Sequence, residues 1–223
     1  MEKIRNKNKG RETLLGVVML TVTLSSMSIL LFNFVLPLIR EEFHLSRSEV
    51  SWVTSSYTLL YGIGTSIYGK LADRYKLKHL ITAGLILFTL ASLLGFLSNS
   101  YGMLLIARCL QAIGAASIPA AATLIPIRYY PVEQRGQAMG TVFAGLALGN
   151  ALGPITSALV ASVLDWRWLF AIPMLLVFTL PMYMKLLGDE EVRESKIDWL
   201  GGALLALSVA QILITSAKLG VVQ

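Results

Sequence analysis

The sequence predicts an all-α protein that crosses a lipid bilayer several times. Of its 223 residues, 55% are hydrophobic and 14% are charged, and the mean hydropathy is +0.67. Soluble domains carry about 25% charged residues. The apolar residues also form uninterrupted blocks of about twenty, the length that crosses a hydrocarbon core of about 30 Å as a helix. These observations exclude a soluble protein.

Seven apolar blocks are long enough to be transmembrane helices. The first follows a basic segment, as a secretory signal would, but it exceeds the apolar core of about 7–15 residues in a signal and lacks a small-residue cleavage site. The predicted spans are 14–37, 51–69, 79–98, 102–125, 137–164, 168–187 and 199–217. The chain therefore divides into a basic N-terminus (1–13), a six-helix bundle (14–187), an acidic linker (188–198) and a seventh helix with the remaining C-terminus (199–223).

Lysine and arginine gather on one side of the predicted membrane. The N-terminus and the second, fourth and sixth loops carry fourteen of the nineteen, whereas the other side carries Arg40, Arg47 and Arg167. Loops rich in these residues stay in the cytoplasm. We therefore expect a protein of the bacterial inner membrane with a cytoplasmic N-terminus. This pattern explains the net charge of +6 by membrane topology, without a nucleic-acid partner.

The second loop, residues 69–79, reads GKLADRYKLKH. It resembles the G-x-L-a-D-r-x-G-r-[KR]-x loop of the major facilitator superfamily. A glycine at a helix end permits a close neighbour, and Asp73 can accept hydrogen bonds from a helix N-terminus or pair with arginines. Lys76 stands where the family has glycine, and a left-handed turn there would cost about 1 kcal/mol or more. The residues that match are Gly69, Leu71, Asp73, Arg74 and Lys78.

The fourth span contains Arg108, the only charge well inside a predicted span. Residues 108–116 read RCLQAIGAA and are similar to the R-x-x-q-G-x-G-a-a segment of the same superfamily, with Ala112 in place of the first glycine. An arginine within the membrane costs at least about 2.5 kcal/mol. We therefore expect it to face a watery cavity or a partner, with Gln111 on the same face. The alternative is that Arg108 snorkels to the outer interface.

Small residues recur every fourth position in the fifth span. Such stripes are common in membrane helices, but Pro154 adds a freed backbone carbonyl and permits a bend. The Gly-Pro step resembles the antiporter motif G-x-x-x-G-P-x-x-G-G, with Ser157 and Ala158 replacing the last two glycines. In the family this motif marks exporters. The stripe consists of Gly145, Gly149, Gly153, Ser157 and Ala161.

Three further segments resemble the same superfamily. Residues 131–138, which include Arg135, resemble its E-x-R-G-x-A turn, 165–170 its W-R-W-x-F helix entrance, and 33–37 its N-V-x-L-P helix end. Together the motifs are similar to the fourteen-helix drug:proton antiporters, including Gram-positive tetracycline exporters, where an Ile-Asp-Trp-Leu-Gly-Gly-like segment opens an additional seventh helix. The resemblance implies a six-helix N-terminal bundle of two inverted three-helix repeats, followed by that helix.

The resemblance also implies a function, namely efflux of a small amphipathic or drug-like substrate by proton motive force, without a cofactor or metal. Substrate then binds between two bundles, so we expect a truncated half that supplies one wall of the cavity. The candidate wall residues are Asn33, Tyr57, Arg108, Gln111 and Asn150. The implied gating residues are Gly69, Asp73, Arg74, Lys78 and Arg135, and the implied antiporter motif comprises Gly145, Gly149, Gly153 and Pro154.

One departure from the tetracycline exporters concerns proton coupling. Their intramembrane glutamates align with Ile29 and Asn150, and no predicted span contains an acidic residue at depth. Proton coupling normally requires such a carboxylate. Either the coupling group lies in another half of the transporter, or the chain is not a tetracycline:proton exchanger of that design.

Other functional classes fit less well. A non-transporting interaction protein, or a half-transporter that acts after dimerising or pairing with a C-terminal half, remains the second interpretation. A retinal pigment requires a lysine well inside the membrane, and the first six predicted spans contain only Lys185, at the end of the sixth. An enzyme is disfavoured because both histidines, His44 and His79, lie in loops, and no H-E-x-x-H motif is present.

Overall fold

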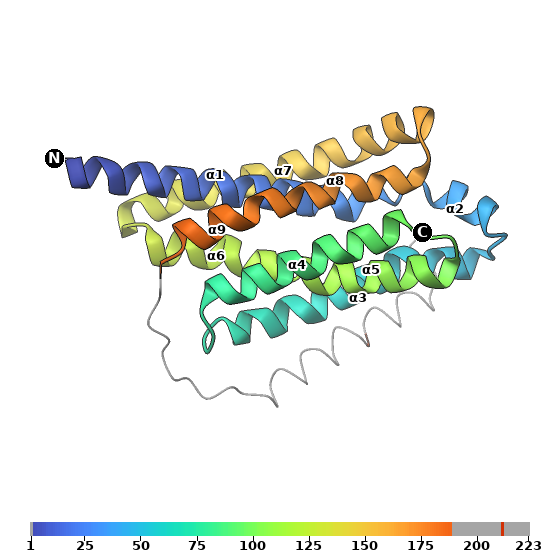
Figure 1. Ribbon diagram of the computed structural model, residues 1–223, viewed down its shortest axis with the longest axis horizontal. Helices are drawn as coiled ribbons and strands as arrows, with labels where there is room; N and C mark the ends of the chain where they lie inside the picture. The colour runs from blue at the N-terminus through green and yellow to red at the C-terminus, as the bar shows by residue number, and fades with distance from the viewer. Residues whose placement is uncertain (1, 189–210, 212–223) are drawn as a thin grey trace.

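A computed structural model describes residues 2–188 and Gln211. The predicted seventh span and nearly all of the linker lie outside the described residues. Every regular element in the described part is a helix. The helices run lengthwise beside one another, and their connections lie at the two ends of the bundle (Figure 1).

The first span is interrupted near its end. Helix α1 (Glu2–Leu31) is followed by a turn and by the short helix α2 (Leu36–Glu42). The predicted span 14–37 is therefore not one continuous helix, because α1 ends at Leu31. Pro37 lies in the first turn of α2, and because proline has no backbone N–H it cannot bond the carbonyl of Asn33, four residues before it. The chain consequently turns before Pro37.

The second span lies in α3 (Arg47–Leu71), which begins with a capping box. The Ser46 hydroxyl accepts a hydrogen bond from the Glu49 amide at 3.2 Å, while the Ser46 amide donates to the Glu49 carboxylate at 2.8 Å. Hydrogen bonds from the Ser46 hydroxyl and amide lower the pKa of Glu49. The carboxylate therefore supports this helix start above the ordinary pKa of a glutamate, and the support is lost as the pH falls through the lowered value.

The turn before α4 (Leu77–Phe96) is unstrained at Lys76. Its backbone has φ −58° and ψ 125°, so Lys76 does not adopt the left-handed turn that would be costly for a lysine. Within the described residues, the non-glycine residue with positive φ is His44, at φ 52° after α2. Lysine in place of the family glycine is therefore accommodated without strain at this position.

Two helices form the fourth span, and one long helix forms the fifth. Helices α5 (Tyr101–Ala115) and α6 (Ser117–Tyr129) meet at Ala116, where Pro119 removes a hydrogen-bond donor from the first turn of α6. Helix α7 (Val132–Val163) continues through Pro154. The predicted turn over 131–138 was wrong, since α7 already begins at Val132.

The sixth span alternates between 3₁₀-helix and α-helix. It consists of η1 (Trp166–Phe170), α8 (Ala171–Met174), η2 (Leu175–Thr179) and α9 (Leu180–Leu186). Pro173 and Pro181 each remove a backbone donor, which accounts for the irregular hydrogen bonding.

Five described segments are long and apolar enough to cross a membrane: Gly10–Leu31, Leu77–Phe96, Tyr101–Tyr129, Val132–Val163 and Trp166–Leu186. Helix α3 has sufficient length, 25 residues, but its serine, threonine and tyrosine side chains lower its hydropathy. A polar membrane helix of this kind faces protein or water in preference to lipid.

The helices associate in a reciprocal pattern. Helix α1 packs along α7, α3 packs along α5, and α4 contacts both α5 and the sixth-span helices. If spans one to three are equivalent to spans four to six, the contact between the first and fifth spans (α1 with α7) corresponds to the contact between the fourth and second spans (α5 with α3). The arrangement therefore fits two related three-helix units.

An ionic cluster fastens one end of the bundle. Glu42 accepts a hydrogen bond from the Trp166 indole at 2.5 Å and from the Arg167 guanidinium at 2.5 Å. The Arg167 Nε donates to the Ser98 carbonyl oxygen at 2.7 Å. The cluster thus connects α2, the turn before α5 and η1 (Figure 1).

Glu42→Ala is expected to destabilise this end, because the buried Trp166 indole N–H would lose its acceptor. An unsatisfied buried donor costs about 1–3 kcal/mol. Thermal unfolding of the purified protein in detergent measures the loss. Glu41→Ala is the matched control, since Glu41 is exposed beside Glu42. Equal midpoints for the two variants would contradict the role of the cluster.

Candidate functional site

Arg108 is fully buried within the bundle, with an exposed fraction of 0%. Its guanidinium carbon lies 4.2 Å from the centre of the Phe32 ring and 4.1 Å from the centre of the Tyr57 ring. The cation is therefore enclosed by aromatic faces, each of which stabilises it by about 0.5–2 kcal/mol. The snorkelling alternative does not describe this side chain, which is held inside the bundle.

Two polar side chains fix the orientation of Arg108. Its NH1 donates to the Gln111 side-chain oxygen at 2.7 Å, and the Gln111 amide donates to the Ser92 hydroxyl at 2.8 Å. The Ser92 hydroxyl donates in turn to the Phe88 carbonyl oxygen at 2.8 Å. This chain connects α5 to α4 and selects one rotamer of the arginine.

Part of the polar cluster has no hydrogen-bond partner within the described residues. The unpaired atoms are the Nε and NH2 of Arg108, the Tyr57 hydroxyl, and the hydroxyls of Ser28 and Ser56. Arg108 also forms no ion pair with a described carboxylate. Buried polar groups require partners, so this layer is chemically suited to receive an electron-rich or anionic group.

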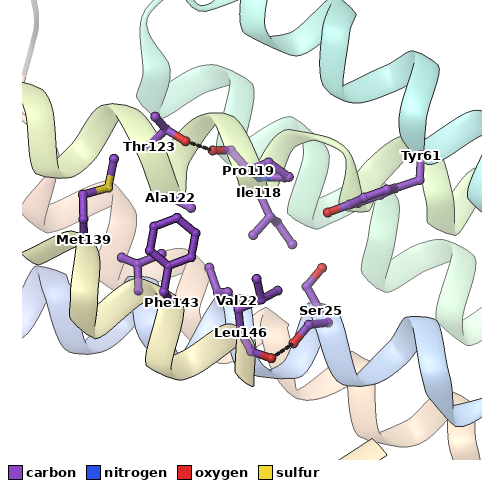
Figure 2. A pocket seen from close by; sticks show the side chains of 12 residues that line it. Val22, Ser25, Tyr61, Ile118, Pro119, Ala122, Thr123, Met139, Phe143 and Leu146 are labelled. Atoms are coloured by element: carbon purple, nitrogen blue, oxygen red, sulfur yellow. Dashed lines mark hydrogen bonds between the residues drawn. The ribbon is translucent and has the colours of Figure 1, made fainter. Parts of the chain in front are cut away.

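A cavity of about 210 Å³ lies beside this layer, between α1, α3, α6 and α7. Figure 2 shows Val22, Tyr61, Ile118 and Phe143 converging on it from these four helices. The lining is mainly apolar, with Ser25, Ser26, Tyr61 and Thr123 as its side-chain hydroxyl groups. Such a surface can bind an amphipathic molecule through apolar contact and a few hydrogen bonds.

Tyr61 joins the cavity to the buried cation. Its ring stacks on that of Tyr57 with a centroid distance of 6.1 Å and an interplanar angle of 17°. Tyr57 contacts the Arg108 guanidinium with its own ring. A molecule against Tyr61 would therefore be separated from the charge by the rings of Tyr61 and Tyr57.

The predicted wall residues fall into two groups. Tyr57, Arg108 and Gln111 come together in the buried cluster. Asn33 is exposed beyond the end of α1, where its side-chain oxygen accepts a hydrogen bond from Thr54 at 3.3 Å. Asn150 is exposed on α7; it is seven residues after Phe143 and so lies on the same helix face, beyond the residues that line the cavity.

The predicted gating residues lie at the opposite end of the bundle from Glu42 (Figure 1). Asp73 and Arg74 are exposed in the turn before α4. The Arg135 Nε donates to the Tyr130 carbonyl oxygen at 3.2 Å. No described atom lies within 4 Å of a Cβ built on Gly69, so the close neighbour that we expected at this glycine is not present within the described part of the chain.

The small-residue stripe of α7 is the contact surface for α1. A Cβ on Gly145 would lie 2.8 Å from the Met19 carbonyl oxygen, and one on Gly149 would overlap the Ser26 hydroxyl and the Thr23 carbonyl oxygen. The Ser157 hydroxyl donates to the Leu31 carbonyl oxygen at 2.6 Å. The stripe therefore sets the separation of two cavity-lining helices.

Sequence reasoning missed most of the cavity lining. Val22, Ser25, Met139 and Phe143 follow helical spacing on their own helices, but an apolar face that lines a cavity has the same pattern as one that faces lipid. Tyr61 was the available signal, because it lies one helical turn after Tyr57.

A match to a family model shows the family to which the chain belongs. The model described as "Major Facilitator Superfamily" matches residues 18–217. The chain belongs to the major facilitator superfamily. Membership agrees with the all-helical fold and with the predicted six-helix N-terminal bundle plus a seventh helix.

Curated members of the superfamily are similar to this chain. Multidrug resistance protein 3 of Bacillus subtilis (strain 168) is 34% identical over 168 residues, which cover 74% of this chain and 32% of that protein. Riboflavin transporter RibZ of Clostridioides difficile (strain 630) is 28% identical over 164 residues, covering 74% of this chain and 36% of that protein. The matched part thus spans about a third of each relative.

A solved superfamily structure shows the same fold. It is a bacterial homologue of the human lysosomal transporter Spinster, inward-facing and unoccupied, with a TM-score of 0.61 and 20% sequence identity. The match covers 85% of this chain and 46% of that one. The described helices therefore correspond to slightly less than half of a solved transporter.

Proposed function

We propose that this major facilitator chain forms one half of an exporter for small amphipathic or drug-like molecules. The observation that carries the proposal is the apolar cavity between α1, α3, α6 and α7, which is backed by the buried Arg108 layer. Apolar contact with Phe143 and hydrogen bonds to Tyr61 and Ser25 suit an aromatic molecule with a few polar groups. Binding at one wall leaves the rest of the molecule open to a second bundle.

The direction of transport is proposed from the antiporter motif. The Gly153-Pro154 step resembles the motif of exporters, and the relative at 34% identity is named a multidrug resistance protein. A second relative, at 28% identity, is named a riboflavin transporter. We therefore select ethidium and riboflavin as two probes.

Proton coupling is proposed to depend on a carboxylate outside the seven predicted spans. Ile29 and Asn150 occupy the positions that would carry glutamates, and neither side chain titrates in the physiological range. A carboxylate of the second bundle could alternate between a proton and the unpaired face of Arg108. In this scheme the arginine sets the affinity of that carboxylate for protons.

We further propose that transport requires a second six-helix bundle, from the same polypeptide, a separate chain or a second copy. Alternating access moves one bundle against another. The test is uptake of ethidium or riboflavin into inverted vesicles that contain the purified chain with and without such a bundle. Proton-driven uptake only in the paired sample supports the proposal. Uptake by the monomeric chain alone would overturn it.

Phe143→Ala is expected to weaken binding of an aromatic probe in the complete transporter by roughly tenfold, because it removes about 1–2 kcal/mol of apolar contact. The concentration that gives half-maximal transport measures this change. Phe178→Ala is the matched control, since Phe178 is 71% exposed and does not line the cavity. Equal effects at both positions would remove the cavity from the transport pathway.

The sidedness of the chain is also proposed. The end that contains the Asp73 turn and the first residues of α1 faces the cytoplasm of a bacterial cell, and Arg40, Arg47 and Arg167 face outward. Gly69, Asp73, Arg74, Lys78 and Arg135 then lie where a cytoplasmic gate would close.

A further inference from the structure

A second cavity, of about 390 Å³, lies where residues Gly10, Arg11 and Leu14 of α1 meet the ends of α6 and α9. Figure 1 shows the ends of α6 and α9 beside α1, at the end of the bundle away from α2. Three of the described residues that line this basic cavity are cations, and none is acidic. The cations are Arg11, Arg128 and Lys185.

The walls of the basic cavity are fastened by hydrogen bonds. The Arg128 guanidinium donates to the Ala72 carbonyl oxygen at 3.0 Å, which orients the side chain between two helix ends. The Tyr130 hydroxyl donates to the Arg11 carbonyl oxygen, so the first turn of the membrane segment of α1 is tied to the loop after α6. These bonds fix the backbone of α1 at Arg11 and the Arg128 side chain beside the cavity, which Lys185 of α9 also lines.

The depth of the cavity in the membrane follows from the span boundaries. The candidate spans that contain α6 and α9 end at Tyr129 and Leu186, and both residues line the cavity. Arg128 and Lys185 each lie one residue inside such a boundary, and Arg11 lies three residues before Leu14, where the apolar block of α1 begins. Because span ends of this kind lie at a membrane surface, we infer that the cavity lies at the level of the lipid headgroups, with Leu14 as its apolar lining residue.

We propose that the basic cavity binds the phosphate of an anionic phospholipid. Charge-assisted hydrogen bonds from arginine and lysine are the strong contacts of phosphate sites, and basic pockets between membrane helices bind anionic headgroups. Free phosphate has the same chemistry, but the interfacial depth and the leucine favour a lipid. A bound lipid would hold the ends of the first, fourth and sixth spans together.

Native mass spectrometry of the purified full chain tests the proposal. The detergent contains equal concentrations of phosphatidylglycerol and phosphatidylcholine. After release from this detergent, the protein is expected to retain more phosphatidylglycerol than phosphatidylcholine. Each cation contributes roughly a fivefold change in affinity, so Lys185→Gln should retain it about fivefold less strongly and Arg11→Gln/Lys185→Gln about 25-fold less. Lys185→Arg, which keeps the positive charge, should retain phosphatidylglycerol as strongly as the parental protein. Arg74→Gln is the control for charge, because Arg74 is an exposed cation at the same end and does not line the cavity.

A competing arm identifies the source of the phosphate. Millimolar inorganic phosphate should leave retention of phosphatidylglycerol unchanged if the ligand is a lipid. Displacement of the lipid by inorganic phosphate would overturn the lipid assignment in favour of a soluble anion. Equal retention of the two lipids, or no loss in the double variant while Lys185→Arg and Arg74→Gln remain folded, would overturn the site itself.

Discussion

Gly149→Ala is expected to lower the stability of the bundle by about 3 kcal/mol, the upper part of the usual range for overpacking. The added Cβ would overlap the Ser26 hydroxyl and the Thr23 carbonyl oxygen and would lie 3.1 Å from the Met27 amide nitrogen. Two of these three atoms belong to the backbone of α1, so no change of side-chain rotamer can relieve the overlap. Helix α1 must move away from α7, which also deforms the cavity between them.

Gly140→Ala is the matched control for this prediction. Gly140 lies in the same helix, and no described atom lies within 4 Å of a Cβ at that position. Alanine there should be neutral or slightly stabilising, because it has the higher helix propensity. Thermal unfolding in detergent should separate the two variants clearly. Equal midpoints would mean that α1 and α7 are not in close contact.

Arg108→Met is expected to abolish most transport in the complete transporter while the bundle remains folded. Methionine replaces a buried charge without an ion pair by an apolar side chain of similar length, which is often neutral or stabilising. The polar layer then loses its cation and its hydrogen bond to Gln111. If the cation makes one charged hydrogen bond to substrate or to the second bundle during transport, its loss costs about 1.5–3 kcal/mol and lowers the transport rate by roughly ten- to 150-fold.

Two further variants separate charge from geometry. Arg108→Lys keeps the charge but not the planar group that lies between the rings of Phe32 and Tyr57, so we expect partial activity. Ile106→Ala changes an exposed side chain of the same helix and should transport normally. Efflux at the parental rate by a folded Arg108→Met protein would show that the buried layer has only a structural role.

The sequence was sufficient to predict the membrane class, the six described spans and the family. Long apolar blocks and ordered motifs are local signals, and they survive small errors at helix ends. The breaks at Ala116 and after Leu31 were missed because each depends on where a proline falls relative to a helix start. The early start of α7 was missed because polar residues 132–136 form ordinary helix outside the apolar block.

The candidate site was predicted only in part, for a physical reason. An intramembrane arginine is costly, so Arg108 and its neighbour Gln111 could be singled out from the chain alone. That Phe32 and Tyr57 would enclose the guanidinium depends on helix rotation, which spacing does not specify. The cavity depends on four helices meeting, and Phe143 has no sequence property that distinguishes it from Phe178, which is exposed but does not line the cavity.

The central claim is that the face formed by α1, α3, α6 and α7 lines a watery pathway. It is tested most directly by alkylation of Phe143→Cys and Leu148→Cys with N-ethylmaleimide, in membranes that contain the complete transporter and carry Cys109→Ser. The two positions are 62% and 47% exposed, lie about 7.5 Å apart along the axis of α7, and are separated by roughly 140° around it. Thiols react as thiolates, which require water. We expect rapid reaction at position 143 that is slowed by substrate, and little reaction at position 148; equally slow reaction at both positions would contradict the account.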